Sequence, residues 1–113
     1  MRILKKHYDF NRVFRRGQHS RAASVAIHYF KRRDHDPSRV GVTATKSAKT
    51  AVARNRSKRL LRAAYMAIEE EILPSYDLVL ILLSDPSSSS AQRVSADLRR
   101  AAQRANLLIE GET

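Results

Sequence analysis

Cysteine and tryptophan are absent from this chain of 113 residues, and glycine and proline occur only three times each. The lack of cysteine excludes a disulfide framework, a thiolate metal cluster and a thiol nucleophile. The longest apolar run, residues 78–83, is far too short to cross a bilayer. The N-terminal residues also lack the apolar stretch of a secretion signal. We therefore expect one soluble, cytoplasmic domain over residues 1–113, with an ordered core over about residues 3–109.

Acidic residues are scarce in the first half of the chain. Residues 1–62 hold 18 Lys or Arg and 3 acidic residues, whereas residues 63–113 hold 4 basic and 8 acidic residues. The two balances, +15 and −4, give the formal net charge of +11. Such a concentrated positive field attracts a polyanion. Nucleic acid is the first candidate partner and an anionic membrane surface the second, and a merely solvated basic surface is the alternative to both.

The N-terminal region predicts a short helix. Asp9 is suited to cap it, because an acidic side chain can accept hydrogen bonds from the first free N–H groups. Phe10, Val13 and Phe14 follow at helical spacing, and Gly17 is expected to end the helix in a left-handed conformation.

Three strands and two more helices are predicted after this helix. Residues 24–31 and 39–45 are expected to form an antiparallel pair across the polar loop between them. Residues 77–83 are apolar throughout and predict a central strand covered on both faces. Helices are expected from about residue 50 to 73 and from about residue 94 to 111. The predicted fold class is α+β, a single two-layer sandwich with the order α-β-β-α-β-α.

The long helix is amphipathic, with a basic outer face. At 100° per residue the core-facing positions are Ala53, Ser57, Leu60, Leu61, Ala64, Ala67 and Ile68. The opposite face carries Arg54, Lys58, Arg59 and Arg62, with Arg56 nearer the boundary. No acidic residue occurs between Pro37 and Ile68 to pair with these cations. The face is therefore interpreted as a phosphate-binding surface, and a solubilising surface is the alternative.

Aromatic side chains suggest a second site. Phe10 and Phe14 could pack in the core or form a platform on which unpaired bases stack. His28 and Phe30 share one face of the strand 24–31 and could extend that platform, or His28 could be a buried, hydrogen-bonded histidine.

Groupings suited to catalysis are poor. Asp34-His35-Asp36 is the only local cluster of metal-ligand types, and beside Pro37 it is interpreted as a surface turn. We therefore predict no catalytic residues, no metal site and no bound cofactor on this chain.

The segment Ala53 to Arg62 resembles the "RNR" helix of the bacterial ribonuclease P protein subunit. The similarity extends to Leu4-Lys5-Lys6 through Asp9-Phe10 to Val13-Phe14 and Gly17, to Arg39-Val40-Gly41, and to Thr45-Lys46 through Ala51-Val52. It covers roughly residues 3–109 in the same order. The resemblance implies a fold like that of ribosomal-protein domains, with an unusual left-handed βαβ crossover.

The resemblance also implies a function. The chain would be the accessory subunit of a ribonucleoprotein endonuclease that removes the 5′ leader from precursor tRNA, with hydrolysis by Mg²⁺ bound mainly to the RNA subunit and substrate. Its partners would be that RNA and precursor tRNA, with no membrane and no obligate protein partner. The residues that match the catalytic-RNA-binding positions are Arg54, Asn55, Arg56, Lys58, Arg59 and Arg62. Those that match the leader-binding cleft are Phe10, Phe14, His28, Phe30 and Lys46.

The sequence departs from the family pattern in three places, one of which is the strand end Leu82-Leu83-Ser84-Asp85, where a basic residue found in many relatives is missing. Ser47, Ala48 and Lys49 replace residues common in the loop before the helix, and His28 stands where an aromatic is more frequent.

Two other classes of function remain open. A structural RNA-binding protein, such as a ribosomal component, would explain the charge, and a metal-dependent nuclease acting alone would need Asp9, Asp34 or Asp36 gathered into one site.

Overall fold

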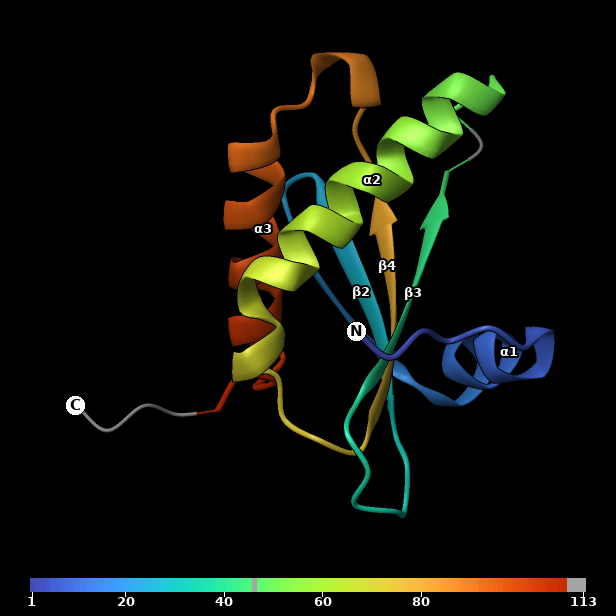
Figure 1. The fold of residues 1–113 in the computed structure, drawn as a ribbon, viewed down its shortest axis with the longest axis vertical. Helices are drawn as coiled ribbons and strands as arrows, with labels where there is room; N and C mark the ends of the chain where they lie inside the picture. The colour runs from blue at the N-terminus through green and yellow to red at the C-terminus, as the bar shows by residue number, and fades with distance from the viewer. Residues whose placement is uncertain (46, 110–113) are drawn as a thin grey trace.

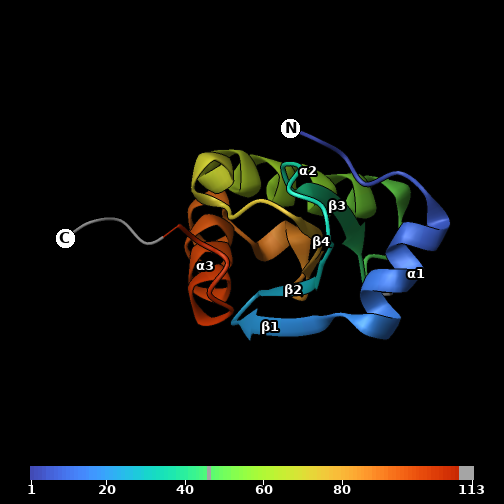
Figure 2. The same cartoon turned by 90° about the horizontal axis from the view of Figure 1, so that it is seen from below.

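A computed structural model describes residues 1–45 and 47–109 and shows a four-stranded sheet with helices on both faces (Figure 1). Two helices cover one face of the sheet and a shorter one crosses the other (Figure 2). The predicted α+β class, with helices packed on a sheet, is confirmed, and the helix on the second face adds a layer to the two that were predicted. The elements in chain order are α1 (His7–Arg16), β1 (Gln18–Ala22), β2 (Val25–Lys31), β3 (Arg39–Ala44), α2 (Ala51–Ile68), η1 (Glu69–Glu71), β4 (Tyr76–Leu82), η2 (Pro86–Ser88) and α3 (Ala91–Arg104).

The strand order is β1-β2-β4-β3, so β4 is central as its apolar sequence predicted. It pairs antiparallel with β2 and parallel with β3. The prediction that residues 24–31 and 39–45 pair with each other is therefore wrong. Strand β4, whose apolar side chains are covered on both faces, lies between β2 and β3 and separates them. Strand β1, which pairs with β2, was not predicted.

Helix α2 connects the parallel neighbours β3 and β4, and this crossover is left-handed. Seen from the face that α2 covers, with both strands pointing up, the chain passes from β3 on the right to β4 on the left (Figures 1 and 2). Right-handed crossovers are the strong default because of strand twist. The unusual handedness implied by the family resemblance is thus present.

The main core lies between the sheet and the helices α2 and α3. Alternate residues of β4, Leu78, Leu80 and Leu82, face it together with Val25 and Ile27 of β2. The amphipathic stripe of α2 buries most of its predicted positions, but Ala67 is exposed and Tyr65 is buried instead. The helix ends at Ile68 rather than near residue 73, because a 3-10 turn follows it.

Helix α1 differs from its prediction at both ends. It begins at His7 without a side-chain cap, so Asp9 lies in its first turn and is buried. Gly17 is not left-handed: its φ is −85°. A Cβ there would lie 2.4 Å from the carbonyl oxygen of Tyr29. Glycine is required at this position because α1 ends against the backbone of β2.

Helix α3 ends at Arg104, and Asn106, with a φ of 57°, turns the chain after it. The predicted stop at Gly111 lies outside the described residues. In the described part of the chain, no helix has the length and apolar character needed to span a membrane.

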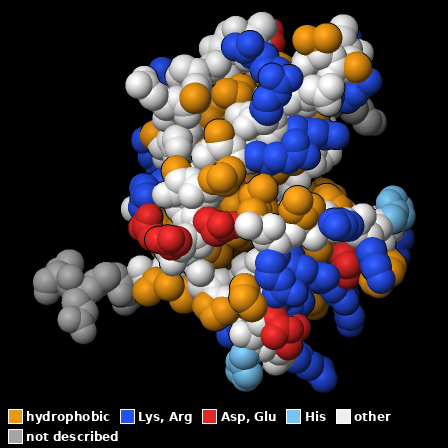
Figure 3. Space-filling view, in the orientation of Figure 1, with side chains coloured by type: hydrophobic (Ala, Val, Ile, Leu, Met, Phe, Trp, Pro, Cys, Tyr) orange, Lys and Arg blue, Asp and Glu red, His pale blue; other side chains and the backbone are white. Residues whose placement is uncertain are grey.

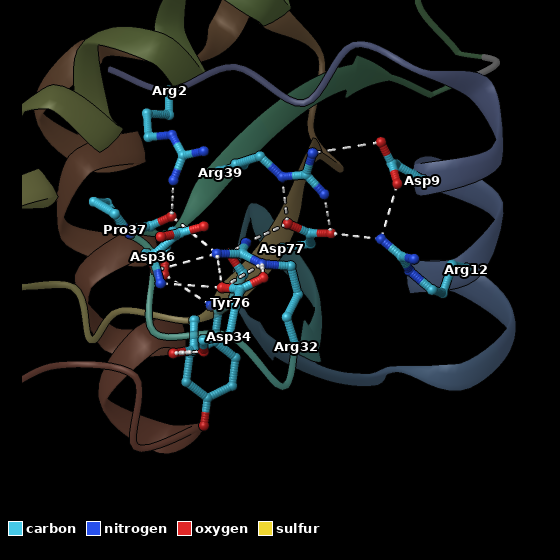
Figure 4. Close-up of polar contacts among 12 residues, drawn as sticks. Arg2, Asp9, Arg12, Arg32, Asp34, Asp36, Pro37, Arg39, Tyr76 and Asp77 are labelled. Atoms are coloured by element: carbon cyan, nitrogen blue, oxygen red, sulfur yellow. Dashed lines mark hydrogen bonds and ion pairs between the residues drawn. The ribbon is translucent and has the colours of Figure 1, made fainter.

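A fully buried carboxylate, Asp77 of β4, fixes α1 and the β2–β3 loop on the sheet (Figure 4). Arg32 Nη1 donates to it at 2.6 Å, Arg39 Nη2 at 2.7 Å and Arg12 Nη2 of α1 at 3.2 Å. Arg12 Nη2 also donates to Asp9 at 2.8 Å. Burial alone would raise the pKa of Asp77, but the hydrogen bonds from Arg39 and Arg32 outweigh it and lower the pKa below its ordinary value.

We predict that Asp77→Asn lowers the free energy of unfolding by about 3–5 kcal/mol, because the three guanidinium groups would lose the buried carboxylate on which all of them converge, and only Asp9 and the exposed Asp34 would still pair with them. Urea unfolding at neutral pH measures this. The matched control is Asp36→Asn, an exposed acid of the same region whose carboxylate makes no ion pair within residues 1–45 and 47–109. Equal stability of the Asp77→Asn and Asp36→Asn variants would contradict this role of Asp77.

The contribution of Asp77 to stability also depends on pH. Because the native pKa of Asp77 is lowered, its stabilisation is complete above about pH 4 and declines as the pH falls toward the native pKa.

Candidate nucleic-acid interface

The outer face of α2 presents cations that make no ion pair with any described residue. Figure 3 shows Lys and Arg side chains gathered over this helix. The first turn of α2 contains no acidic residue, although an acid there would favour the helix dipole. The cations near this end are unfavourable for the isolated helix. Of the six residues predicted to bind the catalytic RNA, five are exposed and Lys58 is half-buried. The exposed ones are Arg54, Asn55, Arg56, Arg59 and Arg62.

Two arginines of this face are held by backbone carbonyls. Arg54 Nη1 donates to the oxygen of Ala48 at 3.4 Å, and Arg56 Nε donates to the oxygen of Pro86 at 2.9 Å. Arg56 therefore lies against η2, at the border of the face, as the helical wheel suggested. Arg59 and Arg62 make no side-chain hydrogen bond to the described residues and extend freely into solvent. The cationic face is thus centred on Arg59 and Arg62.

Local sequence explains how α2 is held in place. The Thr50 side chain accepts a hydrogen bond from the N–H of Ala53 and caps the helix. Ala48, which lies in the loop where the sequence departs from the family pattern, is buried, and its N–H donates to Thr45 O at 3.1 Å. Ser57, on the buried side, donates to Ala53 O at 3.1 Å. The lead-in loop therefore anchors the helix through a small apolar side chain, which leaves the cationic face pointing outward.

The second predicted site lies where α1 crosses the sheet. Phe14 of α1 and His28 of β2 meet in a T-shaped contact, with ring centroids 4.9 Å apart. His19 of β1 lies 5.7 Å from His28. Phe14 is 45% exposed, so it is not an ordinary core residue. Together these rings form an open aromatic surface, which we call the ring platform: Phe14, His19 and His28.

Burial lowers the pKa of His28 below its ordinary value, and the nearby His19 lowers it further. His28 is therefore neutral at pH 7 in the free protein. A neutral imidazole can stack on a base, and a phosphate brought next to it would favour its protonation.

Phe10 and Phe30 are not part of the ring platform. The Phe10 ring packs against Gly41 of β3, where an added Cβ would lie 2.4 Å from the ring. Phe30 lies beside the other flank of α1, and the guanidinium carbon of Arg12 is 5.3 Å from its ring centroid. Both rings contact the small apolar cluster of Leu4, Val13 and Val79 that holds α1 on the sheet. Lys46, the fifth predicted cleft residue, lies outside the described residues.

Sequence reasoning missed the contribution of β1. His19 and Arg21 share the sheet face of His28 and Ala26, because β1 pairs with β2 in that register. The segment Gln18–Ala22 is polar and mostly exposed, so it lacks the apolar alternation that usually marks a strand. Only the position of the segment, directly before β2 with two residues between, could have indicated a hairpin.

Two of the three acidic residues in the first half of the chain, Asp9 and Asp34, pair with arginines. Asp34 accepts hydrogen bonds from Arg32 Nε and Nη2, and Asp9 accepts from Arg12. Within residues 1–45 and 47–109, no three His, Asp or Glu side chains converge where they could share a metal ion. Asp9, Asp34 and Asp36, which a nuclease acting alone would need in one site, are therefore not assembled as a metal centre.

Comparisons with known proteins agree with this arrangement. Residues 1–106 match the model of the family Ribonuclease P. The ribonuclease P protein component of Gluconacetobacter diazotrophicus is 37% identical over 105 residues, which span 92% of this chain and 90% of that protein. The corresponding protein of Clostridioides difficile is 32% identical over 107 residues, spanning 94% and 93%.

Solved structures show the same fold. The RNase P protein of Staphylococcus aureus superimposes with a TM-score of 0.82 at 21% identity, covering 96% of this chain and 98% of that one. The RNase P protein of Thermotoga maritima gives a TM-score of 0.79 at 23% identity, covering 98% and 100%.

Proposed function

The chain belongs to the ribonuclease P protein family, and we propose that it binds the catalytic RNA of ribonuclease P through α2 and the 5′ leader of precursor tRNA on the ring platform. It would thereby assist the endonucleolytic cleavage that produces the mature 5′ end of tRNA, in the cytoplasm. The observation that carries the proposal is the cationic face of α2, whose central arginines have no acidic partner among the described residues.

Binding through this face would be strongly salt-dependent. Each phosphate that a cation neutralises releases counterions, which gives a slope of about −0.9 in log affinity against log salt. If about five cations of α2 contact phosphates, affinity falls roughly 500-fold between about 50 and 200 mM salt. Release of those counterions also offsets the few tenths of a kcal/mol by which each arginine near the helix N-terminus opposes the dipole.

The ring platform would act on the leader. Phe14 offers an exposed face for a base, and stacking on such a ring contributes about 1–3 kcal/mol. His28 lies directly behind it and would stack or contact a phosphate. Mature tRNA has no leader, so this affinity favours the uncleaved substrate over the product and adds binding energy away from the scissile bond.

The RNA subunit would catalyse the cleavage step. Mg²⁺ held mainly by the RNA subunit and the substrate would supply the activated water and neutralise the developing charge. The side chains of this chain would bind and orient: the carboxylates of Asp9, Asp34 and Asp77 already accept hydrogen bonds from arginines. The protein alone is therefore not expected to cleave.

Reconstitution tests the proposal. The purified chain alone should leave precursor tRNA intact, while the chain added to ribonuclease P RNA at low Mg²⁺ should restore cleavage that the RNA performs slowly by itself. Cleavage by the chain alone would instead support a metal-dependent nuclease. Binding without stimulation would support a structural RNA-binding protein, such as a ribosomal component.

Arg59→Ala should weaken binding to ribonuclease P RNA by about 1 kcal/mol or more and reduce the salt slope by about 1, because one phosphate contact is lost. Thermal stability should not change, since this side chain makes no hydrogen bond or ion pair to the described residues. Filter binding at several salt concentrations measures both quantities. Arg93→Ala, which removes an exposed cation of α3, is the control. A slope that stays at the wild-type value would refute the assignment of Arg59.

Phe14→Ala should weaken binding of leader-bearing tRNA by about 1–3 kcal/mol and leave mature tRNA unaffected. Its stability cost should fall well below the 3–5 kcal/mol of a buried phenylalanine, roughly in proportion to its burial. Tyr8→Ala, which removes a more exposed ring of the same helix, is the matched control. Equal losses for both tRNAs would exclude a leader contact at Phe14.

A further inference from the structure

A second basic surface lies on the flank of α1 opposite the ring platform. It is a hollow of about 840 Å³ between α1, the N-terminal segment and the β2–β3 loop. Seven of its ten lining residues are Arg or Lys. Figure 3 shows Lys and Arg side chains gathered between α1 and the β2–β3 loop, apart from the group over α2. The function proposed above uses none of these cations.

The floor of the hollow is an ion-pair network. Arg12, Arg32 and Arg39 converge on the buried Asp77, as Figure 4 shows. The side chain of Arg32 is only 8% exposed, so its charge is neutralised inside the protein. Arg12 donates through Nη2 alone, which leaves its Nε and Nη1 without an acceptor among the described residues. The floor is therefore rigid, with unused donors on one guanidinium.

The rim of the hollow carries cations without counter-charges. Arg16, Lys31 and Arg33 are exposed and lie more than 4 Å from every carboxylate that the structure describes. Arg2 donates only to the carbonyl oxygen of Pro37, at 2.7 Å. Seven lining cations face the four acids Asp9, Asp34, Asp36 and Asp77, which leaves an excess of three positive charges.

The loop that presents Arg33 is held in one conformation. Arg32 Nη2 donates to the carbonyl oxygens of Asp36 and Pro37, both at 3.1 Å. Asp34 accepts from the N–H of Asp36 at 3.1 Å, and its backbone oxygen accepts from Ser75 Oγ. A ligand that contacts the rim therefore does not have to order this loop, which reduces the entropy lost on binding.

We propose that this hollow is a separate phosphate-binding site for the backbone of an RNA strand, with Arg2, Arg16, Lys31 and Arg33 as its contacts. A backbone phosphate supplies the acceptors that these cations lack, and its charge offsets the local excess. The half-buried ring of Phe30 in the same hollow favours a nucleotide over a flat anionic membrane surface, because a nucleotide offers a sugar or base to cover it.

The test is the double variant Arg16→Ala, Arg33→Ala in the full chain. The control is Arg93→Ala, Arg100→Ala, which removes two exposed cations from α3 on the other face of the sheet, one of them, Arg100, 3.8 Å from Asp97. Affinity for ribonuclease P RNA and for precursor tRNA is measured separately from about 50 to 300 mM salt. For at least one RNA, the double variant should reduce the slope by about 1–2 relative to the control. If the variant and the control bind equally at about 1 M salt, this change in slope corresponds to a loss of affinity of roughly 6- to 40-fold at about 0.15 M salt.

The RNA whose slope changes identifies the strand that occupies the hollow. Identical affinities and slopes for the double variant and its control, with both RNAs, would overturn the proposal. So would a loss of binding to vesicles of anionic phospholipid with RNA binding unchanged. The site shares no residue with α2, so the two proposals fail separately: an effect of the double variant without an effect of Arg59→Ala would support the hollow and contradict the role of α2.

Discussion

The buried carboxylate of Asp77 is the constraint on which the arrangement of this molecule depends. It lies at the start of the central strand, where Arg12 of α1, Arg32 after β2 and Arg39 of β3 reach it. This negative charge, assisted by the buried Asp9 that pairs with Arg12 and Arg39, therefore ties the helix, the loop and the edge strand to the middle of the sheet. Leaving three guanidinium groups around an uncharged residue would be costly in this low-dielectric position. The placement of α1 in turn creates the two different surfaces on its flanks, aromatic on one side and cationic on the other.

The same network divides the arginines of the chain into two classes. Those near Asp9, Asp34 and Asp77 are neutralised and serve the fold, although they belong to the most basic half of the sequence. Those at the centre of α2 and on the rim of the hollow have no acidic partner among the described residues. A composition of 22 basic and 11 acidic residues does not reveal this division. The surface charge available to RNA is set by where a few acids lie, and a second strand of RNA can be held without competing for α2.

Local periodicity was enough to predict α2, α3, the central position of β4 and the outward face of Arg59 and Arg62, because each depends on residues close in sequence. It failed where the outcome depends on distant partners. Strand β1 has a polar edge sequence that only its pairing with β2 makes a strand. The pairing of β2 with β4 instead of β3 is a choice between long-range alternatives. The sequence places Asp77 at the start of an apolar strand. It does not reveal the role of this carboxylate, because its three arginine partners lie 38 to 65 residues away. The separation of Phe30 from Phe14 likewise follows from how α1 crosses the sheet.

The division of the arginines is tested most directly by NMR of their side-chain Nε–H groups in ¹⁵N-labelled protein, titrated with a short RNA at physiological salt. We expect the signals of Arg59 and Arg62 to shift until they saturate, while those of Arg32 and Arg39 remain at their free-protein positions because Asp77 holds both groups. Shifts that are uniform over all arginines, or largest for Arg32 and Arg39, would contradict it.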